Sequence, residues 1–313
     1  MEQKELRGHC AVLGAEIFWG ALSPATKLLF AGGIVGPLLL MDLRFFGAAA
    51  LFWLFSPFMK KEHVPHGDML KLFFASLLGI VLNQGTFTLG VSLTSPIDAS
   101  ICTTSMPLFA MVIAAVYLKE PITRLKVLGI VAGASGAVLL VESGQSGGEG
   151  GGSLWGDLFV LLAQCSFACY LVFFKDLIAR YSAYTLMKWM FTYASLCILP
   201  FSYDALSTMP LAVASFGGQE WLALVEVIAG GTFMSYLLIP VGQKVLRPTV
   251  TAIYNYVQPL IASIIAIMLG LGSFNFLKGV AVVLVILGVT LVTRSKSRAQ
   301  IEAYDRMKRE GGA

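Results

Sequence analysis

The chain has 313 residues and a net charge of +4; 57% of its residues are hydrophobic and only 13% are charged. Soluble proteins carry roughly twice that charged fraction, so a mean hydropathy of +0.79 excludes a soluble domain of this length. The basic surplus follows the membrane topology described below and gives no argument for nucleic-acid binding.

Apolar segments of about 20 residues recur along the chain between short polar breaks, the length that a helix needs to cross about 30 Å of hydrocarbon. Irregular backbone facing lipid would leave polar groups unpaired, so each segment is predicted to be a helix. The predicted spans are residues 11–30, 37–56, 69–89, 96–118, 125–142, 155–175, 184–201, 220–240, 249–270 and 275–293. The predicted fold class is an all-α integral membrane protein with ten transmembrane helices.

Lys and Arg alternate between the two predicted sides of the membrane. They occur in both tails and in every even-numbered loop, and the odd-numbered loops have none: 31–36, 90–95, 143–154, 202–219 and 271–274. Because positively charged loops stay in the cytoplasm, both termini are predicted on the cytoplasmic side of the inner membrane. The first apolar segment is predicted to be an uncleaved span, and the five cysteines, in or near spans, predict no disulfide framework.

One residue pattern occurs twice, 152 residues apart. Pro96 and Pro107 recur as Pro248 and Pro259, and the same offset aligns further pairs: Gly79 with Gly231, Gly90 with Gly242, Ile101 with Ile253 and Gly136 with Gly288. Each copy holds five predicted spans, an odd number, so the second copy is inverted, as is typical of secondary transporters. The predicted units are residues 1–142 (first repeat), 143–154 (Gly-rich external linker), 155–293 (second repeat) and 294–313 (basic cytoplasmic tail).

Several short motifs follow one another in a fixed order. They are Trp19-Gly20, Lys27, Arg44, Ser95-Pro96, Met106-Pro107-Leu108-Phe109, Lys119-Glu120-Pro121 and Gly129, then Pro248, Gln258-Pro259-Leu260 and Gly288. This order resembles the EamA half of the drug/metabolite transporter superfamily, over about residues 11–293. Gly272 stands where a second copy of Glu120 would fall, which departs from the pattern. The resemblance implies export or exchange of small metabolites, with amino acids and related compounds favoured.

Pro107 and Pro259 are predicted near the middle of the fourth and ninth spans, where a proline frees the carbonyl four residues earlier. Those carbonyls belong to Thr103 and Asn255, and they are expected either to face a water-filled cavity or to lie at a simple packing kink. Interhelical hydrogen bonding is the alternative role for the polar residues of the third and eighth spans. The predicted substrate-binding residues are Trp19, Asn83, Gln84, Thr103, Thr104, Tyr236, Tyr254, Asn255, Tyr256 and Gln258.

Acidic residues within spans are the second functional signal. Glu16 and Glu226 each lie about one and a half turns into a span and are the candidates for proton coupling. The alternative is that each lies near a membrane interface and is merely solvated. Arg44 is interpreted as a structural counterion near Asp42, and Glu120 as a loop anchor or gate.

The leading hypothesis is a secondary transporter that exports or exchanges a small polar or amphipathic metabolite by alternating access, driven by proton exchange. A nucleotide-sugar or drug-type exporter of the same fold is one alternative, and a membrane-embedded enzyme or a channel is another. The sequence lacks a G-x-x-x-x-G-K-[ST] loop for ATP, and its three histidines lie in the tail or a loop, so neither a catalytic nor a metal site is predicted. The expected partners are a small-molecule substrate, the bilayer and protons, for a monomer or homodimer without a cofactor or nucleic acid.

Overall fold

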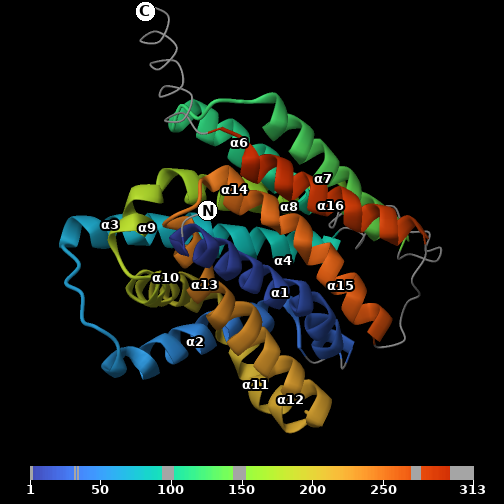
Figure 1. Cartoon of the computed structure of the whole chain (residues 1–313). Coiled ribbons are helices and arrows are strands. Elements are labelled where there is room, and N and C mark those ends of the chain that lie inside the picture. The colour runs from blue at the N-terminus through green and yellow to red at the C-terminus, as the bar shows by residue number, and fades with distance from the viewer. Residues whose placement is uncertain are drawn as a thin grey trace, which may run out of the picture.

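The computed structural model describes residues 3–31, 33, 35–93, 102–143, 153–268 and 276–296. Within these residues the chain forms helices and connections and no strand (Figure 1), which confirms the all-α class. Four helical stretches of the described chain are long and apolar enough to span a membrane, fewer than the ten predicted: Pro37–Phe58, His66–Gly90, Leu154–Phe173 and Gly218–Gln243. Met106–Tyr117 and Gly279–Arg294 are shorter apolar helices.

The first half of the chain, residues 1–142, starts with one long helix. Its elements are α1 (Gln3–Ala31), α2 (Pro37–Phe55), η1 (Ser56–Phe58), α3 (His66–Ser76), η2 (Leu77–Leu82), α4 (Asn83–Leu93), α6 (Met106–Tyr117) and α7 (Arg124–Ser143). The stretch η2 is a π-helical insertion that joins α3 to α4 without a break.

The second half, residues 155–293, has a matching order with three additional short helices, α9, α11 and α14, that have no counterpart among the described residues of the first half. Its elements are α8 (Leu154–Phe173), α9 (Lys175–Arg180), α10 (Ala183–Ile198), η3 (Leu199–Phe201), α11 (Tyr203–Ala214), α12 (Gly218–Val225), η4 (Glu226–Met234), α13 (Ser235–Gln243), α14 (Pro248–Ile253), η5 (Tyr254–Tyr256), α15 (Val257–Met268) and α16 (Phe276–Arg294). The stretch η4 is also π-helical and joins α12 to α13. Insertions of this kind often mark functional regions of a helix.

The two halves interlock. Helix α1 packs against α13 and α15 of the second half, and α8 packs against α4 and α6 of the first. Helices α7 and α16 run side by side at one edge (Figure 1). Each half therefore places its first helix against the later helices of the other half, so neither half buries its apolar faces alone.

Two glycines permit the closest of these approaches. A Cβ added at Gly90 would lie 2.6 Å from Cγ2 of Val160, and one added at Gly242 would overlap Val12. Any side chain at either position would force the helices apart. The same kind of contact thus occurs once where α8 meets α4 and once where α1 meets α13.

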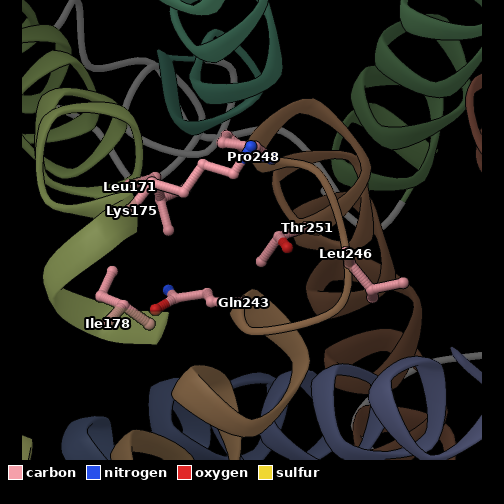
Figure 2. Close-up of a pocket in the computed structure, with 7 residues that line it drawn as sticks. All are labelled: Leu171, Lys175, Ile178, Gln243, Leu246, Pro248 and Thr251. Carbon is pink, nitrogen blue, oxygen red and sulfur yellow. The ribbon is translucent and has the colours of Figure 1, made fainter. Parts of the chain in front are cut away.

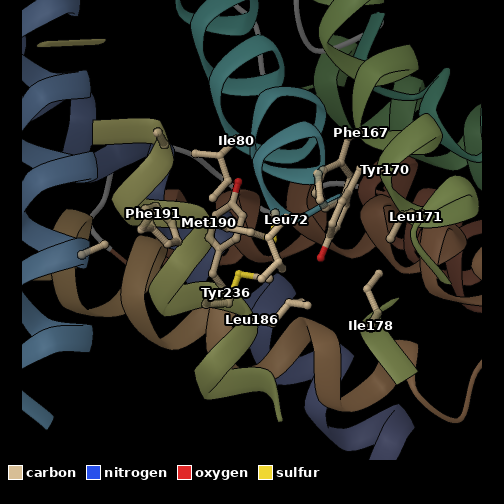
Figure 3. Close-up of a cluster of buried hydrophobic side chains, with 14 of the residues drawn as sticks. Leu72, Ile80, Phe167, Tyr170, Leu171, Ile178, Leu186, Met190, Phe191 and Tyr236 are labelled. Atoms are coloured by element: carbon tan, nitrogen blue, oxygen red, sulfur yellow. The ribbon is translucent and has the colours of Figure 1, made fainter. Parts of the chain in front are cut away.

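The main apolar cluster lies where both halves meet. Figure 3 shows Leu72 and Ile80 of the first half packed among Tyr170, Phe191 and Tyr236 of the second. Aromatic pairs add edge-on contacts, with ring centroids of Phe191 and Tyr236 5.1 Å apart. Such pairs stabilise a core beyond the area that they bury, and here they hold the helices around the polar centre described next.

Candidate functional site

The carboxylate of Glu16 on α1 is buried between the halves. The residue is 2% exposed, and its Oε2 accepts a hydrogen bond of 2.6 Å from Nε2 of Gln258. Among the described residues no Lys, Arg or His nitrogen lies within 4.0 Å of it. A buried carboxylate without a cation is costly, so this position is unusual for a purely structural residue.

A chain of amide groups of the second half links Glu16 to another segment of the first half. Gln258 also donates to Oδ1 of Asn255 at 2.7 Å, and Asn255 donates from Nδ2 to the carbonyl of Thr103 at 3.1 Å. The neighbouring Tyr256 hydroxyl donates to the carbonyl of Thr104 at 3.1 Å. The structure thus brings together six of the residues predicted to bind substrate or protons around one buried polar centre.

Both predicted prolines stand early in helices. Helix α6 begins at Met106, after a turn at Thr104 and Ser105, so Pro107 is its second residue. Pro259 is the third residue of α15, which follows the 3₁₀ turn η5. A first-turn proline costs little because its missing N–H has no partner in a helix anyway. The carbonyl of Thr103 accepts its hydrogen bond from Asn255 of the second half.

Hydrogen bonds also join equivalent positions of the two copies. The pairs Thr103 with Asn255, Thr104 with Tyr256, and Gln84 with Tyr236 are each 152 residues apart. Equivalent residues touch one another in a two-fold arrangement only near its axis. The polar centre therefore lies between the two halves, with residues 152 positions apart bonded to each other.

A second polar group lies one turn along α1. Trp19, three residues after Glu16 and on the same helix face, donates from Nε1 to the carbonyl of Gly231 at 2.9 Å and packs edge-on against Tyr236. Gln84 donates from Nε2 to the Tyr236 hydroxyl at 2.7 Å, and its buried Oε1 has no hydrogen-bond partner among the described residues. An unpaired buried acceptor is available to a ligand that carries a donor.

Arg44 belongs beside this group, which the sequence did not predict. Its Nε donates to the Thr232 hydroxyl at 3.0 Å, and the residue is buried. No ion pair links it to Asp42 in the described chain; Oδ1 of Asp42 accepts from the Ser202 hydroxyl at 2.5 Å. The counterion interpretation is therefore wrong. An arginine inside an apolar span is a sequence signal for a buried polar contact. Nothing in the local sequence identifies its partner Thr232, which lies 188 residues away.

Three predicted residues lie apart from the centre. Asn83 donates to the carbonyl of Ala163 on α8 at 3.0 Å, an interhelical bond. The Tyr254 hydroxyl lies 2.8 Å from Nδ1 of His9 near the start of α1. Glu226 begins η4, and its Oε1 is buried without a hydrogen-bond partner in the described chain.

Glu120 joins the halves at the end of α6. Its Oε2 lies 2.8 Å from Nζ of Lys126 and accepts from the Thr249 hydroxyl at 3.2 Å. Thr249 belongs to α14 of the second half, and all three residues are buried. The contacts of Glu120 are those of a loop anchor. Gly272, which the 152-residue offset aligns with Glu120, lies outside the described residues.

Two cavities lie outside the polar centre. Figure 2 shows a narrow one, lined by Gln243 and Thr251 on one side and by Leu171 and Ile178 on the other. Gln243 Nε2 and Thr251 Oγ1 have no hydrogen-bond partners among the described residues. The other has a volume of about 310 Å³ and lies between η1 and the start of α10. In the described part of the chain, no three His, Cys, Asp or Glu side chains are grouped to hold a metal ion.

Comparison with known proteins gives consistent results. The model of the EamA-like transporter family matches residues 6–142 and 154–294. An uncharacterized transporter of Archaeoglobus fulgidus is 27% identical over 222 residues, 70% of this chain and 74% of that protein. The uncharacterized inner membrane transporter YedA of Escherichia coli is 23% identical over 91% of this chain and 90% of its own length.

A second full-length relative and a solved structure extend the comparison. The uncharacterized transporter YyaM of Bacillus subtilis is 23% identical over 91% of this chain and 93% of its own length. One crystal structure matches with a TM-score of 0.72 at 19% identity, over 93% of this chain and 96% of that chain, which shows a shared fold. The three named relatives are named as transporters and none as an enzyme.

Proposed function

This chain belongs to the EamA-like transporter family, and from that premise we propose that it is a secondary transporter of a small polar or amphipathic metabolite. Amino acids and related compounds are the favoured substrates, exported or exchanged across the cytoplasmic membrane. A nucleotide sugar or a drug-like amphiphile is the alternative cargo. The buried polar centre around Glu16, reached by residues of both halves, is the observation that carries the proposal.

The transporter works by alternating access between two inverted five-span repeats, with both termini in the cytoplasm. The double match to one family model supports the duplication. The hydrogen bonds between equivalent residues and the reciprocal packing of α1 and α8 support a two-fold relation between the copies. Inverted repeats of this kind exchange conformations around a site at their interface.

The substrate binds in the polar centre. Gln258 and Asn255 offer amide groups, the unpaired oxygen of Gln84 offers an acceptor, and Trp19 offers an aromatic wall beside them. A site with apolar walls and a few converging polar groups is typical of small-molecule recognition. The centre is closed here by direct bonds between the halves, and opening of either side breaks those bonds and frees the same groups for the substrate.

Glu16 couples transport to protons. In the closed centre the one side-chain hydrogen bond that Glu16 accepts from the described residues comes from a neutral amide. Burial of an unpaired charge is unfavourable, so Glu16 holds a proton there. It releases the proton when opening admits water. The matching contacts of Gly90 and Gly242 align Val160 with Val12, and the same alignment places Gln164, which does not titrate, opposite Glu16.

A metabolite screen tests the function. Cells that overproduce the chain should release at least one metabolite several-fold faster than cells with an empty vector, measured by mass spectrometry of the medium. Gln258→Leu should return release to the vector level with an unchanged amount of protein in the membrane. Asn83→Leu is the matched control, because Asn83 bonds only a neighbouring helix. Equal release with and without the chain contradicts the proposed transport, and wild-type release by Gln258→Leu contradicts the site.

A flux assay in vesicles, with the metabolite found in that screen, tests the coupling. Glu16→Gln keeps the hydrogen bond and the shape but cannot release a proton, so transport should lose its dependence on external pH. Glu226→Gln is the comparison and should keep that dependence, since no hydrogen bond or ion pair joins Glu226 to the centre among the described residues. If Glu16→Gln retains it, another group couples the proton.

A further inference from the structure

The larger cavity has the properties of a binding site separate from the transport centre. Its volume of about 310 Å³ lies beside the end of α2, at the predicted cytoplasmic level of the membrane. It is lined by Trp53, Ser56, Met59, Lys60, Lys61, Glu62, Tyr184, Thr185 and Lys188. None of these residues takes part in the contacts of Glu16, Gln258 or Asn255.

The cavity carries a surplus of positive charge. Three lysines line it, Lys60, Lys61 and Lys188, and none has an acid within 4.0 Å in the described chain. The one acid of the lining, Glu62, is occupied elsewhere, because it accepts from the amide and the hydroxyl of Ser182 at 3.0 and 2.8 Å. The lining is therefore complementary to an anion.

Lys188 is held in place by neutral groups. Its Nζ lies 3.2 Å from the Ser56 hydroxyl and 4.7 and 5.4 Å from the ring centroids of Trp53 and Trp189. Cation–π contacts of this kind orient an ammonium group without neutralising it. Trp53 is fixed in turn by a 2.9 Å bond from its Nε1 to the Thr192 hydroxyl. The cavity thus contains a positioned cation whose charge is free to act on a ligand.

Exposed apolar side chains adjoin the lining residues in the sequence and give the cavity an apolar rim. Phe55 ends α2 and Met59 follows η1, and both are exposed; Phe58 of η1 is 81% exposed. Aromatic side chains at the end of a span are typical of the membrane–water interface. An anion in this cavity therefore has hydrocarbon on one side and lysines on the other.

We propose that the cavity binds the phosphate headgroup of an anionic phospholipid. Lys60, Lys61 and Lys188 contact the phosphate, and the acyl chains run along Phe55 and Phe58 in the adjacent leaflet. Basic pockets between helices at the cytoplasmic level recognise such headgroups. A soluble phosphate shares the headgroup chemistry, but the exposed apolar rim favours the lipid. The site is independent of the proposed transport and needs only that the chain is embedded in a membrane.

Binding is tested on the full chain purified in detergent, by native mass spectrometry with dioleoyl phosphatidylglycerol or dioleoyl phosphatidylcholine. Phosphatidylglycerol should bind the wild type more tightly. The Lys60→Gln/Lys61→Gln variant should lose about 25-fold in that affinity, about five-fold for each charge near the headgroup. Lys4→Gln/Arg7→Gln removes the same charge from exposed positions at the start of α1 and should bind as the wild type does. These exposed substitutions leave the helix packing intact.

Three outcomes would overturn the proposal. Equal affinity for the two lipids, or an equal loss in the two double variants, means that the cavity does not recognise the headgroup. Competition with inorganic phosphate separates the two sources of the anion. Millimolar phosphate should leave phosphatidylglycerol bound, and displacement at that concentration would make a soluble anion the occupant.

Discussion

The buried ion pair of Lys126 and Glu120 tests how the two halves are joined. The side chains are 1% and 8% exposed, with Nζ and Oε2 2.8 Å apart, and the Thr249 hydroxyl of the second half donates to the same oxygen. Lys126→Met leaves the Glu120 carboxylate buried without a cation. Loss of one partner of a buried pair is expected to lower the free energy of unfolding by about 3–5 kcal/mol.

Removal of both charges should cost much less. The Lys126→Met/Glu120→Gln variant replaces the pair by neutral groups of similar size, and such replacements are often nearly neutral. A double-mutant cycle should therefore give a coupling energy of at least about 2 kcal/mol between the two residues. Reversible unfolding of the purified chain in mixed micelles, titrated with sodium dodecyl sulfate and followed by circular dichroism, measures the four free energies.

A second ion pair provides the control. Lys71 pairs with Asp68 at 3.0 Å, but its side chain is 58% exposed, so Lys71→Met should cost less than about 1 kcal/mol. The two substitutions are chemically identical and differ in burial. Equal costs for Lys71→Met and Lys126→Met, or additive effects in the cycle, would refute the reasoning that burial makes the Glu120 pair strong.

Two further substitutions test packing and acid stability. Gly90→Ala adds a Cβ 2.6 Å from Val160 and should lower the free energy of unfolding by about 1–3 kcal/mol, whereas Gly67→Ala, with no atom within 4 Å, should not lower it; equal losses would contradict the close approach. The acid-stability test concerns Glu62. Burial of its carboxylate raises the pKa, but hydrogen bonds from the first turn of α10, Ser182 among them, outweigh burial and lower the pKa of Glu62 below 4.5. A carboxylate whose pKa is lower in the folded state than in the unfolded state stabilises the fold at pH values above its unfolded pKa. That stability is lost as the pH falls through its folded pKa. Ser182→Ala should therefore weaken the fall of the melting temperature below pH 4.5, and an unchanged pH profile would exclude this contribution.

Local sequence predicted the all-α class because apolar length and proline position are local signals. Helix α2 begins at Pro37, where the second span was predicted to begin, as expected for a first-turn proline. Helix α11, in contrast, falls in residues 202–219, which were predicted to be a loop. It packs against α2, and that tertiary contact leaves little trace in a twelve-residue polar-apolar mixture.

The candidate site was predictable only residue by residue. Glu16, Gln258 and Asn255 each stood out as polar groups inside apolar spans, because such groups are costly there. Their assembly depends on contacts across 242 residues, and no local pattern carries that information. The repeat aligned Gln84 with Tyr236, yet only the structure shows that these equivalent residues bond to each other.

The two halves pack against each other in a similar way, but they differ at the position of Glu16. The proposed alternating access requires two conformations of similar energy, one open to each side, and two halves that pack reciprocally suit that requirement. A symmetric centre would respond equally to protons from either side. Glu16 breaks that equality, because its counterpart in the second copy is Gln164, an amide that does not titrate. In the proposed mechanism, one carboxyl is shared by two access states and binds its proton with different affinity in each, and that difference would tie the conformational change to the proton gradient.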